Sequence, residues 1–214
     1  MLFFGHIGIT LAVELGLKRL YSDRPTEAAS ASDSQTISVT AIDNKPPQSS
    51  VQGFSGHIRH IVRRMDLRVL IVGSMLPDII DKPLGQVFFI ETFMSGRIFA
   101  HTLLLLIVIS LLGVYLYRRR GMIWLVVLSF GSALHLLEDS MWNGFARTLF
   151  WPFMGLTFDR LDLDYWFEGL WYRFLHVPAV YVPEWIGIAI FTGFVTFLIY
   201  RKKVNRFFKT GLVL

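Results

Sequence analysis

Apolar runs separated by short basic stretches make up most of the chain. The first run covers residues 1–17 and ends at Lys18-Arg19, and four more cover residues 69–76, 99–117, 122–137 and 185–200. Because a helix rises about 1.5 Å per residue, the longer runs approach the ~30 Å thickness of bilayer hydrocarbon. The pattern predicts an all-α integral membrane protein with about five transmembrane helices, folded as a single membrane-embedded domain over residues 1–214.

Two segments differ from the apolar runs. Residues 22–56 are rich in Ser, Thr, Asp, Gln and Pro and have few large apolar side chains, so we expect a flexible polar loop. Residues 141–184 contain four tryptophans among many Phe and Tyr residues. Aromatic rings with a polar edge favour the headgroup region, which predicts interfacial helices along one membrane surface.

Composition and charge support the membrane interpretation. Hydrophobic residues make up 53% of the chain, charged residues 17%, and the mean hydropathy is +0.50. The net charge of +5 comes from basic residues that flank the apolar runs, so we do not expect nucleic acid as a partner. The chain has no cysteine, which excludes disulfides, thiolate nucleophiles and Cys-ligated metals.

The basic residues also predict an orientation. One topology places 16 of the 21 Lys and Arg residues in the cytoplasm, including the polar loop, the Arg118–Arg120 turn and the C-terminal tail. The expectation is a multi-pass protein of the inner or plasma membrane with its N-terminus outside and its C-terminus in the cytoplasm. A cleaved signal peptide is less favoured, because positive charge follows the first apolar run instead of preceding it.

Ionisable residues lie at the ends of these apolar runs, where charge is expensive and each group needs a partner or a function. On the predicted topology they meet at the outer face, in the order His6, Asp78, Asp81, Arg97, His101, His135, Glu138 and Asp139. Glu14 alone is expected deeper in the membrane. The outer segment at residues 141–184 would then cover this shared polar site.

The residue types favour a metal centre. His135 and Asp139 are four residues apart and Asp78 and Asp81 are three apart, so each pair shares one face of a helix. Imidazole and carboxylate without thiolate suit Zn²⁺, Mn²⁺ or Fe²⁺, in a site for one or two ions. The alternative is a structural cluster of ion pairs, for example between Asp78 and Arg97.

The ordered motifs resemble the YdjM-like inner-membrane family, described as LexA-binding or as membrane-bound metal-dependent hydrolases. The likeness rests on His6 in an apolar helix, residues 73–81, residues 97–102, residues 135–139 and residues 151–153. It implies His6, Asp78, His101, His135 and Asp139 as metal ligands or catalytic groups, with Asp81 as a further candidate. Gly96 departs from the family, which usually has histidine there.

The motifs are also similar to those of zinc-dependent phospholipase C, which implies a phosphoester or lipid-type substrate. The expected function is therefore metal-dependent hydrolysis at the outer face, with one or two divalent ions per chain, for which zinc or manganese is expected. Asp81 or Glu138 would act as general base, and Arg97 would neutralise the acids or bind substrate phosphate. Membrane lipid is the expected partner. The alternative is a non-catalytic metal-binding, transport or adaptor protein.

Overall fold

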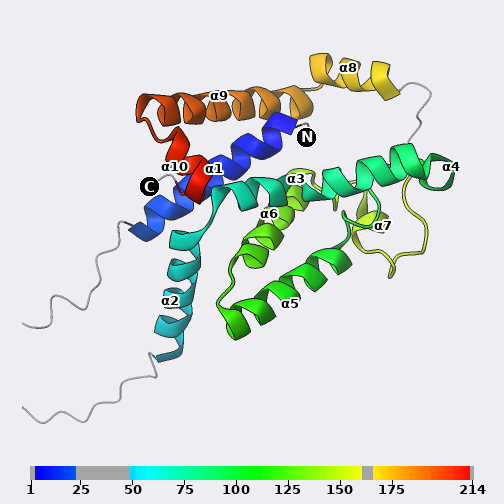
Figure 1. Cartoon of the computed structure of the whole chain (residues 1–214). Helices are drawn as coiled ribbons and strands as arrows, with labels where there is room; N and C mark the ends of the chain where they lie inside the picture. Colours follow the sequence, from blue (N-terminus) through cyan, green and yellow to red (C-terminus); the bar gives the residue numbers. More distant parts are fainter. Residues whose placement is uncertain (1–2, 23–48, 161–165, 213–214) are drawn as a thin grey trace, which may run out of the picture. The chain divides into compact units, whose positions relative to one another are not determined.

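Helices account for all the regular structure that the computed structural model describes, which covers residues 3–22, 49–160 and 166–212 (Figure 1). The main helices are α1 (Phe3–Ser22), α2 (Ser49–Arg64), α3 (Leu67–Pro83), α5 (Leu103–Arg120), α6 (Trp124–Glu138), α8 (Trp166–His176) and α9 (Pro178–Tyr200). Shorter elements are a π-helical turn at Leu84–Phe88, α4 (Ile90–Phe93), α7 (Ala146–Leu149) and α10 (Val204–Thr210). The predicted all-α class is confirmed.

The chain divides into two compact units. One contains Met1–Val13 and Met65–Leu214, and the other contains Glu14–Arg64. The second unit includes α2, which begins at Ser49 within the predicted polar loop. Apolar residues recur there at helical spacing, at Val51, Phe54 and Ile58, which accounts for the helix. Residues 23–48 of the predicted loop lie outside the described residues.

Each predicted apolar run contains a helix, but the boundaries shift. Helix α5 begins at Leu103 because the Thr102 hydroxyl accepts a hydrogen bond from the Leu105 N–H, which caps the helix there. Helix α9 begins at Pro178, well before the predicted run, because proline is favoured at the first helical position.

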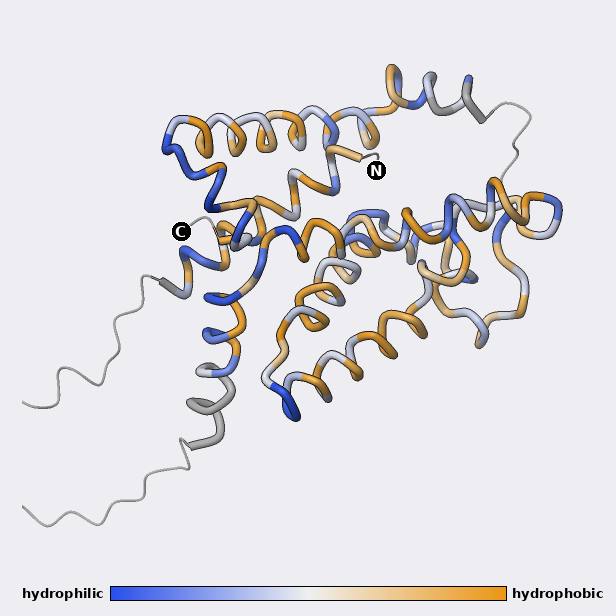
Figure 2. Tube along the Cα trace, viewed as in Figure 1, coloured by the Kyte–Doolittle hydropathy of each residue, from blue (hydrophilic) through white to orange (hydrophobic). Residues whose placement is uncertain are grey.

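By length and composition, α9 is the one described helix that is able to cross a membrane alone. Helix α6 is apolar but has only 15 residues. Helices α1, α3 and α5 carry charged residues near their ends, such as Lys18, Asp81 and Arg118. Figure 2 shows the apolar character of α5, α6 and α9 along most of their lengths. That the chain has five membrane spans therefore stays a prediction.

Helices α3 and α6 cross at glycines. A Cβ atom on Gly73 would lie 2.4 Å from the Leu128 carbonyl oxygen, and one on Gly131 would lie 2.5 Å from the Leu70 oxygen. Backbone therefore packs directly on backbone, an arrangement that small residues permit between helices. The close crossing brings the polar ends of the two helices together.

Pro77 leaves one backbone carbonyl of α3 available for a hydrogen bond from α6. Proline has no N–H, so the Gly73 carbonyl four residues earlier loses its helical donor. The Ser132 hydroxyl of α6 donates to that carbonyl instead, at 3.1 Å. A proline inside a helix thus creates a docking point for the neighbouring helix.

The first turn of α1 packs on α9. The Phe4 N–H donates to Glu184 Oε2 at 3.0 Å, which satisfies one of the N–H groups left open at a helix start. A Cβ atom on Gly8 would lie 2.3 Å from the Gly187 Cα, so the two backbones touch. These contacts hold the part of α1 that contains His6.

At its other end, α3 contacts the C-terminal region. Asp66 caps α3 and binds the Arg68 guanidinium, while Arg68 also donates to the Phe208 carbonyl. Burial raises the pKa of Asp66, but the hydrogen bonds and charge of Arg68 outweigh it and hold that pKa below its ordinary value. The Leu67 N–H donates to the Gly211 carbonyl, so α10 is tied to the start of α3.

Candidate metal centre

Eight polar residues from distant parts of the chain lie together in the first unit. His6 comes from α1, Asp78 and Asp81 from α3, Arg97 and His101 from the segment before α5, and His135, Glu138 and Asp139 from the end of α6. The three imidazoles are fully buried. The structure therefore brings together every residue that the sequence nominated for the site.

Each histidine is oriented through its Nδ1 atom. His135 Nδ1 lies 2.6 Å from the Ser74 carbonyl oxygen, His101 Nδ1 lies 2.7 Å from Asp81 Oδ2, and His6 Nδ1 lies 2.6 Å from Glu138 Oε2. A carbonyl only accepts, and Asp81 already accepts from backbone N–H groups on both of its oxygens, so Nδ1 carries the proton in His135 and in His101. Their Nε2 atoms are then left with lone pairs, as in metal-binding histidines with an outer hydrogen-bond partner.

The Nε2 atoms face one another and two carboxylates. His101 Nε2 lies 3.2 Å from His135 Nε2 and 3.6 Å from Asp78 Oδ1. His135 Nε2 lies 3.9 Å from Asp78 Oδ1 and 4.0 Å from Asp139 Oδ2. His6 Nε2, which is buried and forms no hydrogen bond, lies 3.3 Å from Asp139 Oδ1. Lone pairs this close repel unless a cation lies among them.

The spacing fits a divalent metal ion. Two atoms bound to the same Zn²⁺ at about 2.0–2.1 Å are at most about 4.2 Å apart, and all five separations fall below that limit. Two overlapping triads share His135: His6, Asp78 and His135, and His101, His135 and Asp139. The donor set and its distances therefore suit one ion or two adjacent ions.

Asp81 is committed to hydrogen bonds. It is fully buried and accepts from the N–H groups of Ile98, Ala100 and His101 at 2.8–3.1 Å, besides its bond to His101 Nδ1. Both oxygens are occupied by these donors. Asp81 therefore fixes the segment before α5 and the orientation of the His101 ring.

Two cations contact carboxylate oxygens of the candidate ligands. Arg97 donates from Nε and Nη2 to Asp139 Oδ2 at 2.9 and 2.8 Å, and its guanidinium lies over the Phe145 ring. Lys82 Nζ donates to Asp78 Oδ2 at 2.6 Å, within α3. The predicted pairing of Arg97 with the acids is present, but with Asp139 instead of Asp78.

Some side chains at the site were missed by the sequence analysis. The Ser132 hydroxyl binds a backbone carbonyl of α3, and the Ser74 carbonyl binds His135 of α6. The pattern of apolar runs does not reveal such contacts between helices. The sequence did indicate Lys82, because it follows Asp78 by four residues and so lies on the same face of a helix.

Two other ionisable residues are not part of the cluster. Glu14 lies in the other unit and pairs with Lys18. His176 is exposed and stacks on Tyr172.

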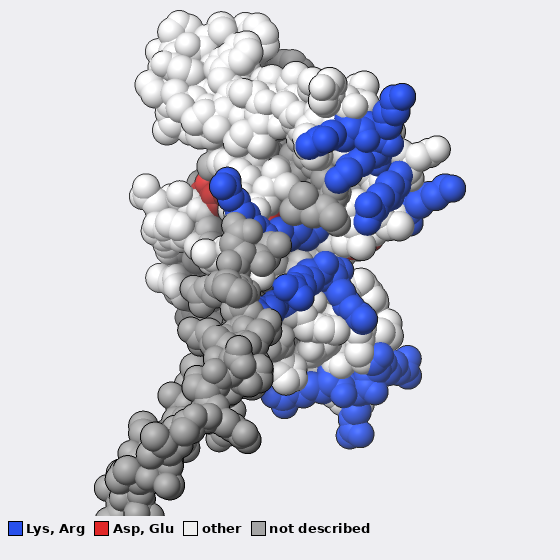
Figure 3. Space-filling model, turned by 90° about the vertical axis from the view of Figure 1, so that its left-hand side faces the viewer, with Lys and Arg blue, Asp and Glu red and all other residues white. Residues whose placement is uncertain are grey.

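The distribution of charge matches this arrangement. On the face in Figure 3, Lys and Arg side chains form clusters while hardly any Asp or Glu surface is visible. The carboxylates of Asp78, Asp81 and Asp139 are at most 9% exposed. Buried carboxylates need paired cations or a metal, and here they gather around the histidines.

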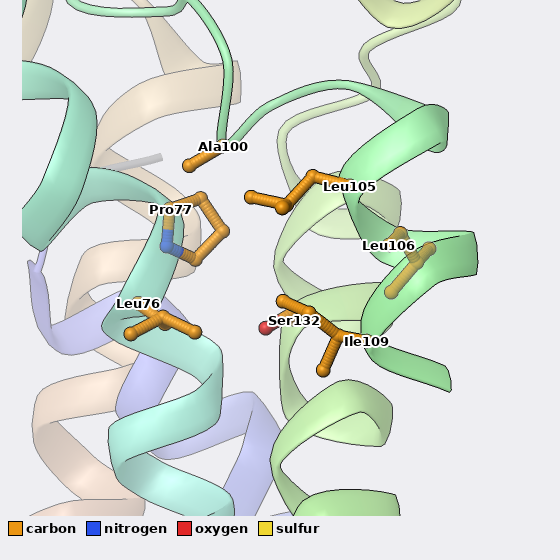
Figure 4. A pocket seen from close by; sticks show the side chains of 7 residues that line it. All are labelled: Leu76, Pro77, Ala100, Leu105, Leu106, Ile109 and Ser132. Carbon is orange, nitrogen blue, oxygen red and sulfur yellow. The ribbon is translucent and has the colours of Figure 1, made fainter. Parts of the chain in front are cut away.

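A small cavity lies beside the cluster, between α3, α5 and α6. Its volume is about 10 Å³, and Figure 4 shows the largely apolar side chains that line it: Leu76, Pro77, Ala100, Leu105, Leu106, Ile109 and Ser132. That volume holds about one water molecule. It is a packing gap, and the candidate metal centre comprises the neighbouring histidines and carboxylates.

Comparison with known proteins gives one match. A family model described as YdjM inner membrane protein matches residues 1–206, which is most of the chain. No curated protein and no solved structure matches it significantly.

Proposed function

The chain belongs to the YdjM inner membrane protein family, and we propose that it is a membrane-bound metal-dependent hydrolase of phosphoester or lipid-type substrates at the outer face. The observation that carries the proposal is the convergence of three buried Nε2 atoms, each ring held through Nδ1, beside Asp78 and Asp139. A purely structural cluster has no need to aim unprotonated nitrogens at one another.

We propose that α1, α3, α5 and α6 cross the membrane together with α9. Exposed apolar side chains along α5 support this, since Ile107, Val108 and Leu111 are 51–66% exposed. Such a surface is unfavourable in water and favourable against lipid tails. With the basic clusters in the cytoplasm, the candidate metal centre lies at the outer face, and a substrate reaches it from the outer leaflet.

The ligands in this proposal are His6, Asp78, His101, His135 and Asp139. A divalent ion bound there would supply Lewis acidity and make a water molecule more acidic. The protein's own contribution is to hold the five donors in place and to exclude bulk water. The Ser74 carbonyl, Asp81 and Glu138 fix the three imidazole rings for this purpose.

Glu138 is the better candidate for the general base. Its Oε2 binds His6, but its Oε1 is buried and forms no hydrogen bond, so it has a lone pair that can accept a proton. Asp81 has four donors on its two oxygens and acts as a positioning residue.

Elemental analysis of the detergent-purified protein tests the proposal. We expect stoichiometric zinc or manganese in the wild type, and its loss in His135→Ala and Asp78→Ala, together with loss of phosphodiesterase or phospholipase activity. The exposed His176→Ala serves as the control and should retain metal. Metal-free wild-type protein that folds normally, or full activity in His135→Ala, would show that the cluster is structural.

A further inference from the structure

Lys82 and Arg97 are neighbours at the open side of the candidate metal centre. The Lys82 side chain is 47% exposed and that of Arg97 is 25% exposed, whereas the carboxylates they contact are at most 9% exposed. A Cβ atom on Gly96 would lie 3.6 Å from Lys82 Cγ, so the Lys82 stem runs past the residue that precedes Arg97. Two cations thus cover the acids from the solvent side.

Gly96 leaves room for this arrangement. The same Cβ atom would lie 2.5 Å from Gln86 Nε2, so any larger residue would displace the Gln86 amide. Gln86 therefore adds a polar amide beside the two cations. Lysine, arginine and a side-chain amide are groups that proteins use to bind oxyanions.

The carboxylates of the candidate metal centre explain why Lys82 and Arg97 lie beside it. Lys82 pairs with Asp78 and Arg97 pairs with Asp139, while Asp81 and Glu138 bind His101 and His6. A bound ion would share the charge of Asp78 and Asp139, and this weakens their hold on the two cations.

We propose that Lys82 and Arg97, with the Gln86 amide, form an anion-binding pair that takes the phosphoryl group of the substrate once the metal is bound. This inference rests on the proposed function. Lys82 has a flexible stem and turns outward at little cost, and Arg97 offers a planar fork that binds two oxygens. The same pair covers the acids when substrate and metal are absent.

Binding of ³²P-labelled inorganic phosphate to the purified full-length chain tests the pair, by equilibrium dialysis with and without Zn²⁺ or Mn²⁺. We expect saturable binding to the metal-loaded wild type only. Lys82→Met and Arg97→Met should each weaken it roughly tenfold or more, because each removes a charge-assisted hydrogen bond. Lys82→Arg should retain most of the affinity.

Arg147→Met is the matched control, because Arg147 is an exposed cation in α7 near the same end of α6. It should bind phosphate as the wild type does. Metal content and helical circular dichroism are measured on every sample and should be unchanged in all variants. Displacement by short-chain phosphatidic acid or by glycerol 3-phosphate identifies a lipid headgroup or a soluble ester as the source of the phosphoryl group.

The outcomes separate the two proposals. Wild-type protein that binds no metal overturns the proposed function and this inference with it. Metal-loaded protein that fails to bind phosphate overturns only the anion-binding pair. Equal binding by wild type, Lys82→Met and Arg97→Met also overturns the pair, because the phosphate would then be held by the metal alone.

Discussion

Asp81 is a buried carboxylate that holds the segment before α5 through three backbone N–H groups and orients the His101 ring. Asp81→Asn keeps the shape of the side chain but removes its charge and replaces one acceptor with a donor. We expect metal affinity to fall about 10- to 100-fold, as for other outer partners of ligating histidines. Competition with a zinc chelator measures the change.

Asp159→Asn is the matched control for this substitution. Asp159 accepts a hydrogen bond from the Thr148 hydroxyl, away from the histidines. The control should bind zinc as tightly as the wild type. Equal zinc affinity in Asp81→Asn and the wild type would contradict the positioning role of Asp81.

At single residues, the sequence predicted which side chains lie close together better than the contacts that each of them makes. His6, His101 and His135 stand out because polar groups in apolar runs are costly and need a reason. The division of roles depends on contacts between helices. Asp81 looked like a possible base until the fold placed backbone N–H groups on both of its oxygens, and neither spacing nor composition reveals that contact.

The crossing of α3 and α6 sets the distance between His135 and its Ser74 partner. Gly131→Val would place new atoms against the Leu70 backbone, where a Cβ atom already lies 2.5 Å from the carbonyl oxygen. We expect the helices to separate, with a loss of about 1–3 kcal/mol in stability and most of the bound metal. Thermal unfolding in detergent and elemental analysis measure the two effects.

Gly193→Val provides the comparison for this prediction. Gly193 lies in α9, and a Cβ atom there would meet nothing within 4 Å. The change in helix propensity is the same, so this variant isolates the effect of the crossing. If both variants lost equal stability and equal metal, the α3–α6 contact would not be what positions His135.

Among the elements, the positions of helices were predictable and their ends were less so. Apolar runs locate α1, α5 and α6, because lipid-facing and buried helical faces are both apolar. The ends depend on local hydrogen bonds, such as the Thr102 cap of α5. The π-helical turn at Leu84–Phe88 had no counterpart in the prediction, since no periodicity marks a change of helical pitch.

For the whole molecule, composition predicted the helical membrane class but not how many helices cross the bilayer. The charged residues that form the candidate metal centre shorten the apolar part of the helices that carry them, as Asp78 and Asp81 do in α3. Length, hydropathy and the number of charged residues together then select α9 alone among the described helices. In α3 the residues that suggest function thus obscure the count of spans, and in α5 the basic residues of the last turn do so.

Sidedness of the chain is open to direct measurement, because the sequence has no cysteine and any single cysteine gives an unambiguous signal. On the proposed topology, Asn143→Cys lies outside, while Arg120→Cys and Thr210→Cys lie in the cytoplasm; all three positions are exposed. In right-side-out vesicles, a membrane-impermeant maleimide should label only Asn143→Cys, and all three should react after solubilisation.

Opposite sides for residues 120 and 143 require α6 to cross the bilayer, and opposite sides for residues 143 and 210 require α9 to cross. Labelling of Arg120→Cys and Asn143→Cys from the same side would refute a spanning α6. Labelling of Arg120→Cys and Thr210→Cys, but not of Asn143→Cys, would keep both crossings but invert the protein, which would place the candidate metal centre in the cytoplasm.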